Sequence, residues 1–166
     1  MEELLKLCLQ AAQAAGEEIM KIYVTDFSVE QKEDDSPITQ ADQAAHSKIM
    51  EYLRHTDYPV LSEEGKCLPY TYRKEWNRFW LVDPLDGTKE FIKINGEFTV
   101  NIALIENGIP IMGVVYAPAK DVMYYGSNKG AFKLENYKHE SVPIQLPLPK
   151  ENNVFTIVLS RSHMNR

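Results

Sequence analysis

The segment Asp83-Pro84-Leu85-Asp86-Gly87-Thr88 combines two carboxylates with a proline, a glycine and a hydroxyl. The apolar run Phe79-Trp80-Leu81-Val82 before it is typical of a short buried strand. Because Pro84 has no N–H group, the strand is predicted to end there and the chain to turn. The two acids would then lie on a tight loop at the carboxyl end of a strand, where carboxylate and carbonyl oxygens suit a hard cation such as Mg²⁺.

Gly87 and Thr88 extend this chemistry from a cation to a phosphate. Gly87 lets the backbone approach a ligand closely, and Thr88 offers a hydroxyl at a predicted helix start. Exposed N–H groups at a helix start favour a phosphate dianion. The segment therefore predicts a metal ion and a phosphate held side by side. Asp, Pro and Gly are also typical of a simple turn, and the other acids of the chain have to decide between the two interpretations.

A second pair of acids, Glu63-Glu64, follows a short strand predicted over Val60-Leu61-Ser62. Adjacent acids repel one another, which favours a cation that compensates at least one of them; the alternative is a solvated loop of charges. Consecutive strands are often neighbours in a sheet. If these two strands are neighbours, Glu63, Asp83 and Asp86 converge.

Asp42 is a further candidate, on a helix predicted from Ser36 to about His55. Asp42 and His46 are four residues apart and share one face of this helix. Asp42 also lies three residues after Thr39, a spacing typical of a capping box. Either Asp42 caps its own helix or its carboxylate is aimed at the metal site, and the sequence leaves both roles open.

The elements around these residues predict an α+β fold, an antiparallel sheet with two packed helices. The first helix is expected over about residues 2–23, since Leu4, Cys8 and Ile19 belong to one apolar face. A charged connector precedes the second helix. From residue 97 the pattern alternates and predicts an antiparallel meander of about four strands up to residue 134. Residues 136–153 are predicted as a loop and residues 154–159 as a last strand.

Composition narrows the class of protein. With 166 residues, 44% of them hydrophobic and 25% charged, the chain is typical of a soluble globular domain. A net charge of −6 argues against a nucleic-acid-binding surface. No apolar run has transmembrane length, and the acidic start Met1-Glu2-Glu3 argues against export, so a cytoplasmic protein is expected. Cys8 is expected in the core, and the two cysteines suggest neither a disulfide framework nor a zinc site.

Taken together, Asp42, Glu63-Glu64 and the segment 83–88 resemble the signature of the lithium-sensitive, Mg²⁺-dependent phosphatases of the inositol monophosphatase superfamily. The longer segment from Leu81 to Ile92, with Lys89-Glu90-Phe91 as its distinguishing part, is similar to the bacterial 3'(2'),5'-bisphosphate nucleotidase branch. Two further segments are similar to the same branch: residues 96–103 and 160–163.

The resemblance implies hydrolysis of the 3'-phosphate of adenosine 3',5'-bisphosphate, a small nucleotide, to AMP and phosphate. It implies about two or three Mg²⁺ ions, with Asp83 bridging two of them. Glu63 and the Leu85 carbonyl would complete the first site and Asp86 would serve the second. An inositol phosphate or sugar phosphate phosphatase of the same superfamily, or an inactive metal-binding fragment, are the alternatives.

The resemblance also implies the substrate contacts and the proton chemistry. The substrate-binding positions would be Glu63, Leu85, Asp86, Gly87 and Thr88, with the N–H groups of Gly87 and Thr88 on phosphate oxygens. Asp42, hydrogen-bonded to the Thr88 hydroxyl, would orient the attacking water or accept its proton, which makes these two the catalytic pair. Glu64 would support the metal ligands.

The family is longer than this chain, so residues 1–153 are predicted to be a metal- and phosphate-binding α+β domain of a layered sugar-phosphatase fold. Residues 154–166 would begin a second, C-terminal domain. Half of a layered fold is expected to expose apolar surface. Family resemblance also allows a peripheral location on the inner face of the inner membrane. The sequence indicates no particular oligomeric state.

Overall fold

The computed structural model describes residues 1–23, 29–31, 37–66, 68–137 and 141–147. Its helices are α1 (Glu2–Tyr23), α2 (Gln40–Leu53), α3 (Tyr70–Arg73) and α4 (Thr88–Ile92). Its strands are β1 (Val29–Gln31), β2 (Pro37–Thr39), β3 (Val60–Ser62), β4 (Arg78–Asp86), β5 (Thr99–Glu106), β6 (Ile109–Ala117), β7 (Val122–Ser127), β8 (Gly130–Glu135) and β9 (Ile144–Leu146). The predicted last strand, residues 154–159, and the predicted second domain lie outside the described residues.

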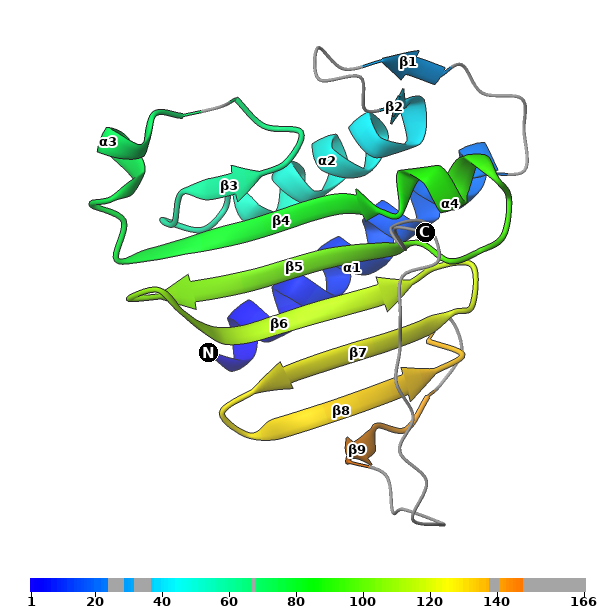
Figure 1. The fold of residues 1–166 in the computed structure, drawn as a ribbon. Helices are drawn as coiled ribbons and strands as arrows, with labels where there is room; N and C mark the ends of the chain where they lie inside the picture. Colours follow the sequence, from blue (N-terminus) through cyan, green and yellow to red (C-terminus); the bar gives the residue numbers. More distant parts are fainter. Residues whose placement is uncertain (24–28, 32–36, 67, 138–140, 148–166) are drawn as a thin grey trace, which may run out of the picture.

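The central feature is a seven-stranded sheet in the order β3-β4-β5-β6-β7-β8-β9 (Figure 1). The strands β4 to β9 pair antiparallel, which confirms the predicted meander, while β3 pairs parallel with β4 at one edge. A parallel neighbour needs a crossover connection, and α3 lies within that connection. The predicted α+β class is confirmed.

Two long helices, α1 and α2, lie against one face of the sheet, and the opposite face carries no helix among the described elements (Figure 1). Their contact surfaces consist mostly of small side chains, so the helices pack close to one another and to the strands. Gly16 of α1 lies at a close approach to the sheet, because a Cβ atom there would lie 2.4 Å from the Tyr116 ring of β6. The helix-covered face is therefore a tightly packed core.

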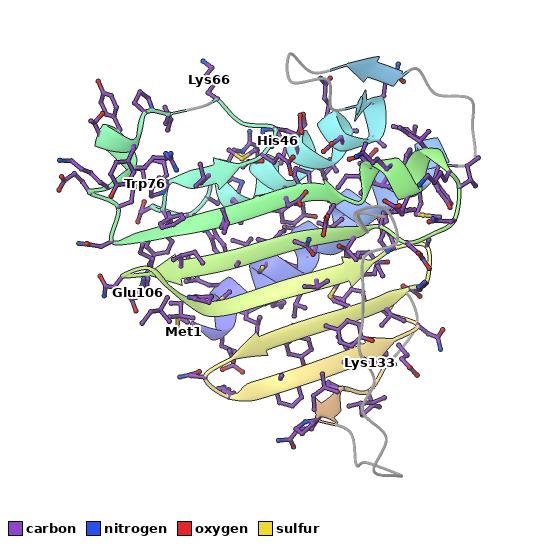
Figure 2. The ribbon with its side chains drawn as sticks, in the orientation of Figure 1. Met1, His46, Lys66, Trp76, Glu106 and Lys133 are labelled. Carbon is purple, nitrogen blue, oxygen red and sulfur yellow. The ribbon has the colours of Figure 1, made fainter. Side chains whose placement is uncertain are left out.

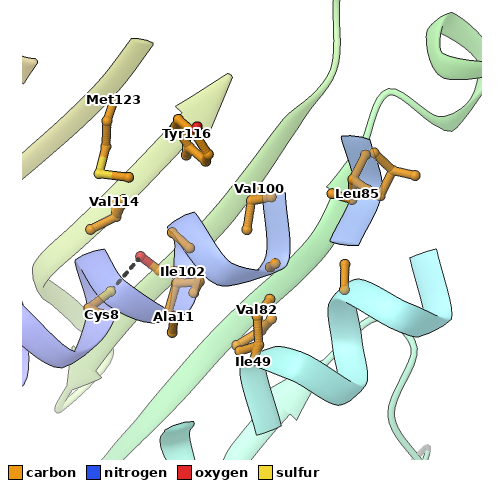
Figure 3. Close-up of a cluster of buried hydrophobic side chains, with 14 of the residues drawn as sticks. Cys8, Ala11, Ile49, Val82, Leu85, Val100, Ile102, Val114, Tyr116 and Met123 are labelled. Atoms are coloured by element: carbon orange, nitrogen blue, oxygen red, sulfur yellow. Dashed lines mark hydrogen bonds between the residues drawn. The ribbon is translucent and has the colours of Figure 1, made fainter. Parts of the chain in front are cut away.

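That core contains the large side chains Trp80, Tyr116, Phe91 and Phe98, all fully buried or nearly so. Figure 3 shows its centre, where the Cys8 thiol donates a hydrogen bond to the Ile102 carbonyl at 3.8 Å. Burial raises the pKa of the Cys8 thiol, which keeps it protonated and unreactive. The prediction that Cys8 belongs to the core is confirmed.

Three boundaries differ from the sequence predictions. Residues 37–39 form β2, antiparallel to β1, so the second helix begins at Gln40 rather than Ser36. β1 itself lies in the predicted connector. Ile144–Leu146 within the predicted loop pairs with β8 as β9, because an exposed sheet edge offers backbone groups to any extended segment beside it. Among the described residues no helix is long and apolar enough to cross a membrane.

Candidate functional site

The parallel pairing of β3 with β4 brings two of the predicted acids together. Ser62 is the register partner of Val82, and the next N–H group, that of Glu63, donates to the Val82 carbonyl at 3.1 Å. β3 therefore ends level with Val82 of β4, which places Glu63 beside Asp83. The prediction that these strands are neighbours is confirmed, and it depends on the crossover through α3.

Alternation along the strands places these acids on the sheet face without helices. Trp80 and Val82 point into the helix-covered core, so Leu81 and Asp83 point the other way. A groove of about 510 Å³ lies on that face and is lined by Leu61, Glu63, Leu81 and Asp83, with Asn101 of β5 opposite Asp83. The groove is apolar along the strands and acidic at the end where β3 stops.

The prediction that Pro84 ends the strand is wrong. β4 continues to Asp86, and its register against β5 shifts between Asp83 and Asp86. Pro84 lies within this irregular stretch, where its missing N–H removes no ladder hydrogen bond. The bulge lets the strand carry both acids and still remain paired with β5.

Gly87 turns the chain from β4 into α4. It has a φ of 92°, and a Cβ atom would lie 2.8 Å from the Glu97 carbonyl oxygen, so this position requires glycine. The first N–H groups of α4 have no acceptor within the helix, as at any helix start. The turn was predicted at Pro84, and the structure places it three residues later, where Gly87 supplies the left-handed backbone.

The Thr88 side chain is tied to the segment that precedes α4. Its hydroxyl donates to the Leu85 carbonyl at 3.1 Å. The Leu85 carbonyl keeps a second lone pair for another partner. Asp42 lies in the first turn of α2 and is the buried charged side chain of the described core, with 3% of its surface exposed.

Asn101 is a site residue that sequence reasoning missed. Its Nδ2 donates to Asp86 Oδ2 at 3.2 Å, so it ties β5 to the far side of the bulge. Its Oδ1 is buried and has no hydrogen-bond partner. In the sequence, the signal that could have identified Asn101 was an amide side chain between apolar positions of a predicted strand. The structure adds that Asn101 is the register partner of Asp83, which places it between the two acids of the segment.

The imidazole of His46 lies beside the end of β3 (Figure 2), with Nδ1 2.9 Å from the Ser62 hydroxyl oxygen. Burial lowers the pKa of His46, and the negative charge of Glu64 opposes that shift. The imidazole is therefore neutral at pH 7. Through His46, α2 thus contacts Ser62 at the end of β3.

These residues do not form a complete metal cage by themselves. Across the described ranges, no three or more His, Cys, Asp or Glu side chains gather where they could hold one metal ion. The donors that are present are hard oxygens: the carboxylates of Glu63, Asp83 and Asp86, the Leu85 carbonyl and the Asn101 amide. Mg²⁺ commonly takes one or two carboxylates and completes its shell with water and phosphate, so the donor set fits this ion.

The chain is similar to curated proteins that are named as nucleotidases. The 3'(2'),5'-bisphosphate nucleotidase CysQ of Salmonella typhimurium is 49% identical over 164 residues, which cover 96% of this chain and 64% of that protein. The CysQ protein of Escherichia coli K12 is 49% identical over 158 residues, covering 93% and 62%. The chain thus spans less than two thirds of the length of these curated relatives.

Solved structures of similar proteins lead to the same group of relatives. The crystal structure of CysQ from Bacteroides thetaiotaomicron has a TM-score of 0.85 and 41% identity, covering 99% of this chain and 65% of that one. An IMPase from Thermotoga maritima has a TM-score of 0.69 and 28% identity, covering 80% and 51%. The model described as the inositol monophosphatase family matches residues 1–166. Because that match runs over the whole length of the chain, the chain belongs to the inositol monophosphatase family.

Proposed function

We propose that the protein hydrolyses the 3'-phosphate of adenosine 3',5'-bisphosphate to AMP and phosphate in an Mg²⁺-dependent reaction. The observation that carries this proposal is the β3–β4 register, which sets Glu63 beside Asp83 at the start of the bulge and the Gly87 turn. The 49% identity to proteins named 3'(2'),5'-bisphosphate nucleotidase supports the choice of substrate.

Glu63, Asp83, Asp86 and the Leu85 carbonyl hold the metal ions in this proposal. When bound, about two or three Mg²⁺ ions would neutralise the phosphate charge and activate a water molecule. A phosphomonoester dianion repels an attacking nucleophile, and its uncatalysed hydrolysis is among the slowest of known reactions. An acidic site therefore needs these cations before a dianion can approach.

The chain's own groups then position the substrate and the proton. The N–H groups of Gly87 and Thr88 bind phosphate oxygens, and the fixed turn at Gly87 orients both of them. Thr88, through its hydrogen bond to the Leu85 carbonyl, holds that carbonyl in place. Asp42 accepts a proton from the attacking water, for which a buried carboxylate is suited. We place the enzyme in the cytoplasm, with nucleotides as its small-molecule partners.

The substitution Asp83→Asn in the full-length protein tests this function. It keeps the shape of the side chain and removes its charge, so hydrolysis should fall by about 1000-fold or more, about 4 kcal/mol of transition-state stabilisation. Mg²⁺ affinity by titration calorimetry should fall too, with the melting temperature unchanged. Asp57→Asn, at an exposed turn, is the matched control.

Two results would contradict the proposal. Wild-type Mg²⁺ affinity in Asp83→Asn would mean that the segment 83–88 is only a structural turn. A wild-type protein that hydrolyses inositol 1-phosphate faster than adenosine 3',5'-bisphosphate would belong to the alternative phosphatase class.

A further inference from the structure

The acids Glu63 and Glu64 lie in a turn that is fixed at both of its ends. The Glu63 N–H group donates to the Val82 carbonyl, and the Gly65 N–H group closes the turn on the Ser62 carbonyl, each at 3.1 Å. The Ser62 side chain has its own partner, His46 Nδ1 at 2.9 Å. The backbone of this turn is therefore bound to β4, and its first side chain is bound to α2.

The two acids of the turn face different surroundings. Glu63 lines the groove together with Asp83, on the sheet face without helices. The charge of Glu64 acts on His46, which belongs to α2 on the opposite face. Ser62 lies between these environments, since alternation along β3 directs its side chain towards α2 and that of Glu63 away from it. Moving Ser62 would rotate the turn and shift Glu63 relative to Asp83.

His46 is well placed to hold Ser62. It lies one helical turn after Asp42, so the same rigid helix carries the buried carboxylate and the imidazole. In its neutral form, the half-buried ring makes one hydrogen bond with the Ser62 hydroxyl, in which Nδ1 donates or accepts according to the tautomer. The hydrogen bond joins two segments that are 16 residues apart in the chain.

We propose that His46 is a positioning residue, whose hydrogen bond to Ser62 sets Glu63 beside Asp83 in the geometry that divalent cation binding requires. This inference rests on the proposed function, because it assigns His46 to the metal site of that function. Groups that orient metal ligands commonly change metal affinity by about 10-fold to 100-fold when they are removed. A hydrogen bond that merely fastened α2 to the sheet would affect unfolding and leave metal affinity unchanged.

The experiment measures Mg²⁺ binding by titration calorimetry in the full-length protein without substrate, for five variants. His46→Leu and Ser62→Ala each remove one partner, and a double variant removes both. His46→Asn is the rescue, because an amide atom on Cγ takes the place of the imidazole Nδ1. His55→Leu, at an exposed position after α2, is the matched control. Thermal unfolding without metal is recorded for all five.

We expect His46→Leu and Ser62→Ala each to weaken Mg²⁺ binding about 10-fold, and the double variant to be no weaker than either. His46→Asn should stay within about 3-fold of the wild type. In turnover assays, His46→Leu should need more Mg²⁺ for half-maximal rate and should recover the wild-type rate at saturating Mg²⁺.

Equal losses in His46→Asn and His46→Leu, or losses that add in the double variant, would overturn the inference. So would unchanged Mg²⁺ affinity in His46→Leu beside a lowered melting temperature. A wild-type protein that binds Mg²⁺ but hydrolyses no phosphomonoester refutes the proposed function alone, whereas an active wild type with unaffected His46 variants refutes the positioning role alone. A wild type that binds no Mg²⁺ refutes both.

Discussion

The two faces of the large sheet differ in packing although they share the same strands. On the face covered by α1 and α2, Trp80, Val100 and Tyr116 have no exposed surface. On the opposite face, Leu81, Val115 and Tyr124 are 45%, 42% and 41% exposed. An antiparallel sheet with one solvated face normally alternates apolar with polar residues, but this second face is apolar along much of β4 to β6.

The difference in packing between the two faces means that one face stabilises the fold and the other carries the candidate site. The helix-covered face holds the core, and the other face holds the groove whose acidic end carries Glu63 and Asp83. Substitutions on the covered face should therefore lower the free energy of unfolding, and matched substitutions on the open face should leave it nearly unchanged. Three pairs of variants test this contrast, and each pair compares one position on the helix-covered side of the sheet with one on the open face.

The largest effect is expected for Trp80→Ala compared with Leu81→Ala. These neighbours in β4 point to opposite faces, and Trp80 also donates from Nε1 to the Thr56 hydroxyl at 3.0 Å. Trp80→Ala should cost about 3–5 kcal/mol of unfolding free energy, because it opens a large cavity. Leu81→Ala should cost about 1 kcal/mol or less. Urea denaturation measures both, and equal costs would refute the division between the faces.

A middle-sized effect is expected for Gly16→Ala compared with Gly126→Ala. Alanine is the better helix former, but its Cβ at position 16 would meet the buried Tyr116 ring, so we expect a net loss of about 1–2 kcal/mol. At Gly126 the nearest atom to such a Cβ is 3.7 Å away, and the change should stay within about 0.5 kcal/mol. A stabilised Gly16→Ala variant would show that α1 can move away from the sheet.

The smallest effect is expected for Tyr116→Phe compared with Tyr124→Phe. The Tyr116 hydroxyl donates to Asp121 Oδ1 at 3.1 Å, and its loss should cost about 1 kcal/mol. Tyr124→Phe, on the open face, should cost less than about 0.5 kcal/mol. Thermal or urea unfolding at pH 7 distinguishes them, and equal costs would contradict the prediction.

Alkaline pH should sharpen this last contrast. Burial, with the charge of Asp121 second, raises the pKa of Tyr116 above its ordinary value. The unfolded chain then loses this proton near pH 10 while the folded chain keeps it, so stability is complete below about pH 10 and falls above it. Tyr116→Phe should reduce that slope by up to about 1.4 kcal/mol per pH unit. An unchanged slope would mean that Tyr116 ionises equally in both states.

The sequence alone determined much of this protein. Helical spacing predicted α1, alternation predicted the meander, and the segment 83–88 with Glu63 indicated the family, because local periodicity and rare motifs are written in consecutive residues. The sequence did not predict β1, β2 or β9, which are three residues each and are stabilised by pairing rather than by their own propensity.

Only the tertiary structure decided how the site is built. From the neighbouring residues alone, Pro84 predicts the end of a strand. In the structure, β4 stays paired with β5 through a bulge and ends at Asp86. The sequence assigned no role to Asn101, and of His46 it indicated only that it shares a helix face with Asp42. The register with β4 brings Asn101 to Asp86, and the packing of α2 brings His46 to Ser62. Such contacts join residues 15 and 16 positions apart, so no pattern of neighbouring residues reveals them.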